Sequence, residues 1–141
     1  MALQFTPFIM LNGNANEAIR FYEQALGAQV VFKQTFGDAP EEESNPPMTE
    51  EAKKRIAHSV LVVGEAELFV SDSSPDQPLE RGDQVNICIT VEDKTKAEQI
   101  YEALRPNGKV LLPLQPIYFS PAYGMVTDQF GVTFQIFTKR S

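Results

Sequence analysis

The stretch FIMLNGNANEAIRFYEQALG, residues 8–27, decides the fold of this chain. It begins with an apolar run, continues through the polar turn Asn12-Gly13-Asn14 and ends in an amphipathic segment. Apolar side chains recur in that segment at helical spacing; they are Ala15, Ala18, Ile19, Tyr22, Ala25 and Leu26. Asn is a common helix-capping residue, and Gly27 suits the left-handed position that ends a helix. The stretch therefore predicts a strand, a turn and a helix in that order.

The second half of the chain repeats this order. A second apolar stretch, residues 85–91, leads into a polar turn and then into another amphipathic segment. The shift that places Ala18 on Ala97 also places Pro7 on Asn86. The chain is therefore predicted to hold two related modules.

Each predicted helix is followed by strand-like runs that are bounded by turn residues. These runs are residues 29–36, 56–63 and 67–71 in the first half, and 109–112, 123–128 and 132–138 in the second. We therefore expect an α+β protein of two tandem βαβββ modules, residues 1–72 and 80–141, joined by a linker at 73–79. Since one helix covers one sheet face in each module, the other faces are expected to form a curved mixed sheet around a cavity.

Composition excludes several classes of function. Twelve Lys and Arg against nineteen Asp and Glu give a net charge of −7, which argues against nucleic acid and an anionic membrane as partners. One Cys and one His exclude a disulfide framework and a Cys- or His-rich metal cluster. No signal peptide or membrane-spanning run is read, so we expect a cytoplasmic protein.

The excess acid is concentrated in residues 37–51, which contain acidic side chains and prolines but no Lys or Arg. Proline is unsuited to a helix interior or a central strand, so a solvated loop is expected here. A lid over a cavity is one functional alternative, and a surface that recruits a basic partner is another.

Motifs along nearly the whole chain resemble those of one superfamily. They are Asn12-Gly13-Asn14-Ala15, Phe21-Tyr22, Leu26-Gly27-Ala28, Ile56-Ala57-His58 and Val126-Thr127-Asp128-Gln129-Phe130-Gly131-Val132. With the two-module order, they resemble the vicinal oxygen chelate (glyoxalase/bleomycin resistance) superfamily. The similarity is strongest to its PhnB-like branch, also labelled as a 3-demethylubiquinone-9 3-methyltransferase domain. The resemblance implies a small-molecule ligand and a homodimer. No Gly-rich adenosylmethionine-binding turn is found, so the methyltransferase label has no support.

The resemblance also implies four positions that hold a divalent metal in superfamily enzymes. They correspond here to Pro7, Asn86, Gln135 and a position near Glu67–Phe69. Proline has no donor side chain, and amides are poor substitutes for imidazole or carboxylate. We therefore expect no cofactor and no conventional metal site, although a divalent metal on atypical ligands is left open.

Strand alternation predicts which residues line the cavity. The expected sets are Asn86, Cys88 and Thr90; Thr133, Gln135 and Phe137; and, by the repeat relation, Pro7, Ile9 and Leu11. Cys88 is expected to be a small buried residue, and Asp128 and Gly131 are expected in a turn. Asp72 is expected to cap or turn the linker.

Four residues are the candidate ligand-binding set: His58, Asn86, Tyr123 and Gln135. His58 is either an ordinary strand residue or a hydrogen-bonding group or base in the cavity. Tyr123, with Tyr118 and Phe119, either packs a proline-rich loop or closes the mouth of the cavity.

The favoured hypothesis is a PhnB-like protein that binds a small, largely apolar molecule without a conventional metal site. The alternative is a metal-dependent lyase, isomerase or dioxygenase of the glyoxalase type, with Glu67 and three of the candidate residues (His58, Asn86, Gln135) as ligands. Whether the chain catalyses a reaction is left open by the sequence.

Overall fold

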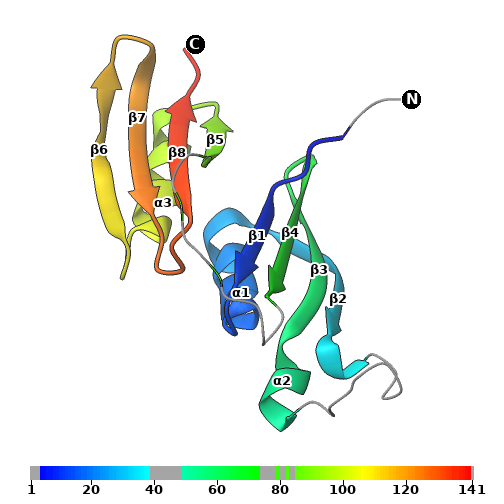
Figure 1. Cartoon of the computed structure of the whole chain (residues 1–141). Helices are drawn as coiled ribbons and strands as arrows, with labels where there is room; N and C mark the ends of the chain where they lie inside the picture. The colour runs from blue at the N-terminus through cyan, green and yellow to red at the C-terminus, as the bar shows by residue number, and fades with distance from the viewer. Residues whose placement is uncertain (1–3, 39–48, 74–78, 80–81, 83–84, 141) are drawn as a thin grey trace. The chain divides into compact units, whose positions relative to one another are not determined.

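A computed structural model describes residues 4–38, 49–73, 79, 82 and 85–140. The chain forms two compact units, Met1–Glu80 (unit 1) and Arg81–Ser141 (unit 2). The predicted α+β architecture of two βαβββ modules is confirmed, and the eight strands of the described residues are divided between two mixed sheets of four (Figure 1). Most of the acidic stretch and of the linker (39–48 and 74–78) lies outside the described residues.

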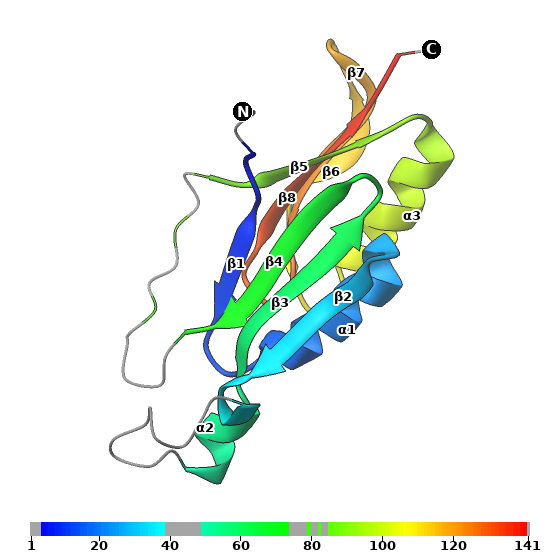
Figure 2. The same ribbon diagram turned by 90° about the vertical axis from the view of Figure 1, so that its right-hand side faces the viewer.

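Unit 1 is a four-stranded sheet with one long helix on one face. Its elements are β1 (Phe8–Leu11), α1 (Ala15–Leu26), β2 (Gln29–Thr35), the 3-10 turn η1 (Phe36–Asp38), α2 (Glu50–Lys54), β3 (Ile56–Val63) and β4 (Ala66–Asp72). The strand order is β1-β4-β3-β2, in which β1 runs parallel to β4 and the other pairs are antiparallel. Helix α1 contacts β2, β3 and β4 and lies behind the sheet in Figure 2.

Unit 2 has the same topology. Its elements are β5 (Ile87–Val91), α3 (Lys94–Leu104), β6 (Lys109–Ile117), β7 (Ser120–Thr127) and β8 (Thr133–Thr138). The order is β5-β8-β7-β6, again with the first strand parallel to the last. Helix α3 contacts β5, β7 and β8. In each unit we call the sheet face opposite the long helix the open face.

Strand β1 presents the opposite side chains to those expected. Ile9 and Leu11 were predicted to line the cavity, but they are only 6% and 5% exposed, and Ile9 pairs with the buried Val70 of β4. Phe8 and Met10 lie on the open face instead, because side chains alternate along a strand.

The facing of β1 was predicted wrongly because the two strand–helix turns differ in length. Three residues, 12–14, connect β1 to α1, whereas two, 92–93, connect β5 to α3. An alignment made on the helices is therefore one residue out of register on the preceding strands. A one-residue slip moves every side chain of a strand to the other face. The repeat relation consequently does not equate Pro7 with Asn86.

Strand β6 is longer than predicted. The sequence indicated a strand that ends at Leu112, because Pro113 and Pro116 follow it, yet the strand continues to Ile117. It is the edge strand of its sheet, and proline is tolerated at an edge because one side of the strand makes no ladder hydrogen bonds. The acidic stretch also differs from the expected loop at its end, since Glu50 starts α2 and Thr49 caps that helix.

Two buried aspartates, Asp72 and Asp128, accept hydrogen bonds from backbone N–H groups. Asp72, 3% exposed, accepts from Gly13 N at 2.7 Å, Ala15 N at 3.0 Å and Ile56 N at 2.9 Å. It therefore caps α1 from the end of β4, in place of Asn14, whose side chain makes no capping hydrogen bond. Its predicted capping role thus applies to α1 rather than to the linker.

The turn between β7 and β8 agrees with the prediction. The Asp128 carboxylate accepts from the backbone N–H groups of Phe130 and Val132. Gly131 has a φ of 89°, a conformation that favours glycine. Together these residues fix the start of β8, which carries Gln135.

Candidate functional site

Three strands of unit 2 bring three of the four predicted ligand-binding residues together. Asn86 directly precedes β5, Gln135 lies in β8 and Tyr123 lies in β7. Strand β8 buries alternate residues against the helix side, Phe134 and Ile136 among them, which leaves Gln135 on the open face. The register of β8 with β5 and with β7 then places the Gln135 amide between Asn86 and Tyr123.

The three side chains form a continuous hydrogen-bonded row, which we call the polar row. The Tyr123 hydroxyl donates to Oε1 of Gln135. Nε2 of Gln135 donates to Oδ1 of Asn86 at 2.7 Å. All three groups are neutral, so the polar row offers hydrogen-bonding capacity without a formal charge.

An aromatic strip borders the polar row. Phe119, in the turn between β6 and β7, has its ring centroid 5.0 Å from that of Tyr123. It also stacks on Phe137 of β8, with centroids 6.1 Å apart and an angle of 15° between the rings. We define the strip as Phe119, Tyr123 and Phe137. Tyr118 contacts Phe119 at 5.0 Å but is itself largely exposed.

Cys88 is exposed, so the prediction of a buried small residue is wrong. It lies in β5, which is the edge strand of the unit 2 sheet, and it faces the open side next to Gln135. Neither α3 nor a second neighbouring strand covers that position. The expectation rested on the lack of a nearby base or helix N-terminus that would activate the thiol, and it did not consider the strand's place in the sheet.

The pKa of the Tyr123 hydroxyl is raised above its ordinary value, first by burial and then by the nearby Cys88. At neutral pH this hydroxyl is therefore protonated and available as a donor. The burial that raises this pKa agrees with the exposed fraction of Tyr123, which is only 9%.

The raised pKa predicts a change in stability at high pH. Unfolded tyrosine loses its proton near a pH of about 10, before folded Tyr123 does, so the folded state holds more protons and the free energy of unfolding falls as pH rises further. The Tyr123→Phe variant should lose less stability in this range than the wild type, as measured by urea unfolding at several alkaline pH values. Equal losses in the two proteins would contradict the assignment.

His58 is not part of the polar row, because it belongs to β3 of unit 1. Its ring lies on the open face of that unit among three phenylalanines. The centroid distances are 5.0 Å to Phe69, 6.1 Å to Phe32 and 6.2 Å to Phe8. Phe8 is 50% exposed and Phe32 is 46% exposed, so this aromatic group is partly open to solvent. The sequence interpretation missed the group because its members come from four different strands.

The residues at the four implied metal positions do not fit a divalent cation. The oxygens of Asn86 and Gln135 already accept hydrogen bonds within the polar row. Pro7 has no side-chain donor, and the Glu67 carboxylate of unit 1 accepts from Gln4 at 3.1 Å. In the part of the chain that the structure describes, no three His, Cys, Asp or Glu side chains gather as a metal site would require.

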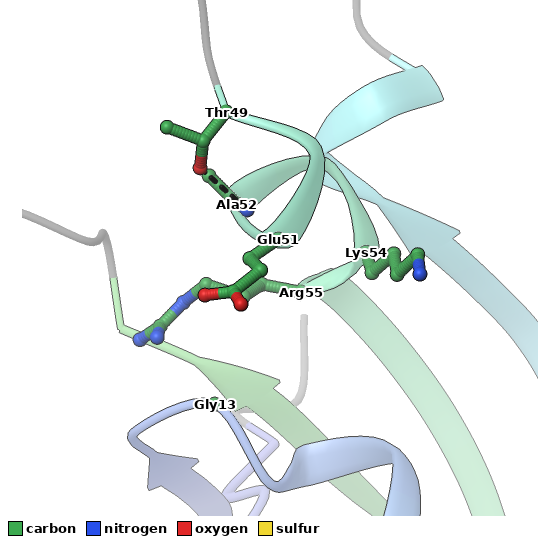
Figure 3. Close-up of a pocket in the computed structure, with 6 residues that line it drawn as sticks. All are labelled: Gly13, Thr49, Glu51, Ala52, Lys54 and Arg55. Atoms are coloured by element: carbon green, nitrogen blue, oxygen red, sulfur yellow. Dashed lines mark hydrogen bonds between the residues drawn. The ribbon is translucent and has the colours of Figure 1, made fainter.

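A pocket of about 380 Å³ lies beside α2 in unit 1, and the described residues that line it include none of the predicted set (Figure 3). The described residues that line it are Gly13, Thr49, Glu51, Ala52, Lys54 and Arg55. The Arg55 guanidinium donates to Asn12 and to Ser73, and so connects the β1–α1 turn to the end of β4. In Figure 3, Lys54 extends away from the Arg55 guanidinium, so the basic groups do not converge. We assign the pocket a structural role.

The fold and the polar row together define the class: an α+β protein of two βαβββ modules with a neutral hydrogen-bonding group on one open face. The chain belongs to the Glyoxalase/Bleomycin resistance protein/Dioxygenase superfamily, whose family model matches residues 4–136. Among the described residues, no helix has the length and apolar character needed to cross a membrane.

Similar proteins cover the chain almost completely. The crystal structure of protein PA1353 from Pseudomonas aeruginosa is 34% identical, with a TM-score of 0.87 over 99% of this chain and 100% of that one. Protein YjdN of Escherichia coli is 24% identical over 95% of this chain and 94% of its own length. A putative 3-demethylubiquinone-9 3-methyltransferase, PhnB protein, from Bacillus cereus shares the fold, with a TM-score of 0.78 at 21% identity over 96% of this chain and 99% of that one.

Proposed function

We propose that this protein binds a small, largely apolar molecule on the open face of unit 2, without a conventional metal site. The polar row carries the proposal. A hydrogen-bonded Tyr–Gln–Asn chain beside stacked aromatic rings combines a few directional polar groups with an apolar surface, as small-molecule sites commonly do. A cytoplasmic homodimer is part of the proposal.

A double substitution in the polar row tests this function. The fluorophore prodan, a neutral naphthalene with one ketone, is a suitable probe because its fluorescence reports transfer from water to an apolar site. Asn86→Leu combined with Gln135→Leu removes both amides and should weaken prodan binding about fivefold, since one neutral hydrogen bond contributes about 1 kcal/mol. Fluorescence titration measures the affinity.

The matched control is Gln99→Leu, the same chemical change at an exposed position of α3. It should bind prodan as the wild type does, and all three proteins should unfold at similar urea concentrations. Unchanged prodan affinity in the double variant would refute the site. Retention of about one nickel, manganese, iron or zinc ion per chain after incubation and desalting would refute the absence of a metal site.

A further inference from the structure

The direction of the hydrogen bonds in the polar row determines what it offers to a ligand. A neutral phenol is a strong donor and a weak acceptor. Its hydroxyl points at Oε1 of Gln135, so the amide of Gln135 turns its NH₂ group toward Asn86. There the Asn86 oxygen accepts, at 2.7 Å.

Asn86 is the last member of this chain of bonds. Its oxygen accepts from Gln135, and its own NH₂ is the donor group that it offers to a ligand. Among the described residues, no acceptor is bonded to that nitrogen. Asn86 is also only partly buried, so a small molecule has access to it.

We infer that Tyr123 is a positioning residue that, through Gln135, fixes Asn86 as a hydrogen-bond donor, and that the ligand presents a neutral acceptor oxygen on a flat apolar body. This inference rests on the proposed function and narrows it to a ligand class: an aromatic or conjugated carbonyl compound. The flat body is inferred from the aromatic rings beside the polar row, Phe119 and Phe137, since aromatic rings pack favourably against other aromatic rings. The polar row is neutral and so offers no opposite charge to an anion.

A pair of ligands of the same shape isolates the contribution of the acceptor oxygen to the binding affinity. Acetylnaphthalene and isopropenylnaphthalene, substituted at the same ring position, differ only in that C=O is replaced by C=CH₂. Each is titrated against prodan bound to the wild-type protein, and displacement gives its affinity. The ketone should bind about fivefold more tightly than the alkene, the contribution of one neutral hydrogen bond.

Two substitutions distinguish a positioning role of Tyr123 from a packing role. Asn86→Asp keeps the shape and still accepts from Gln135, but it presents an oxygen in place of the NH₂ group, so the ketone preference should disappear or reverse. Tyr123→Phe keeps the ring and frees the Gln135 amide to turn over, so the ratio of the ketone affinity to the alkene affinity should fall toward one. A purely structural role of Tyr123 would weaken both ligands equally and leave their ratio unchanged.

The outcomes distinguish this inference from the function on which it rests. If neither naphthalene displaces prodan, and prodan itself does not bind, the proposed function is overturned. If both bind the wild type with equal affinity, the function stands and the donor role of Asn86 is overturned. If Tyr123→Phe leaves the ratio at its wild-type value, the positioning role is overturned. The Gln99→Leu control should keep the full preference.

Discussion

Replacing Asp72 with alanine is expected to lower the free energy of unfolding by about 4 kcal/mol, which is a large part of the stability of an ordinary domain. The substitution leaves three backbone N–H groups without their acceptor, those of Gly13, Ala15 and Ile56. The last two lie in a buried environment, where an unsatisfied donor costs most. Helix α1 also loses its N-terminal cap. Urea unfolding followed by circular dichroism measures the loss.

Asp93→Ala is the matched control. Asp93 caps α3 with one exposed hydrogen bond to Lys96 N at 2.8 Å, so its loss should cost only about 1 kcal/mol. Asp72→Asn, which keeps one acceptor oxygen, should lie between the two alanine variants. If Asp72→Ala is no more destabilising than Asp93→Ala, Asp72 does not connect α1, β3 and β4 as described.

The second large effect is expected at Gly108, which precedes β6. A Cβ atom there would lie 2.2 Å from the carbonyl oxygen of Thr127 and 3.0 Å from backbone atoms of Asp128. Both neighbours are backbone, so no side chain is able to rotate away. Gly108→Ala must therefore separate the α3–β6 connection from the β7–β8 turn, at a cost of about 3 kcal/mol. For a chain of this size the melting temperature should fall by roughly 10 °C.

Gly82→Ala is the control for this substitution, because no heavy atom of the described residues, apart from its chain neighbours, lies within 4 Å of the Cβ position at Gly82. It should change the melting temperature by about 2 °C or less, since surface substitutions rarely exceed about 0.5 kcal/mol. Equal effects of the two alanine substitutions, measured by differential scanning calorimetry, would contradict the close approach at Gly108.

The features that were predicted well from the sequence are the local ones. Helix α1 begins and ends where the periodicity and Gly27 place it, with Gly27 in the left-handed conformation at its end. The facing of β1 was predicted wrongly because it depends on the length of the turn before the helix. The side-chain spacing within the helix does not report that length. The end of β6 was predicted wrongly because Pro113 is acceptable only at a sheet edge, and strand order is a non-local property.

The same division applies to the candidate site. Alternation along β8 was enough to place Gln135 on the open face. Its bonds to Asn86 and Tyr123, however, depend on the register of three strands that are distant in the sequence. Likewise, nothing local to His58 indicates that Phe8 and Phe69 lie beside its ring. Chemistry carried by single residues was predictable, and chemistry that depends on strand register was not.

The parallel pairing of the first and last strands also governs the order in which the chain folds during synthesis. Strand β1 pairs with β4, with Phe8 opposite Phe69, so β1 leaves the ribosome before its partner and pairs only after the rest of unit 1 has been made. Strand β5 depends on β8 in the same way. Translation adds about 5–20 residues per second, so β1 spends seconds unpaired with Phe8 and Met10 open to other chains. Chaperone capture of nascent chains should therefore be greatest just before β4 and β8 emerge.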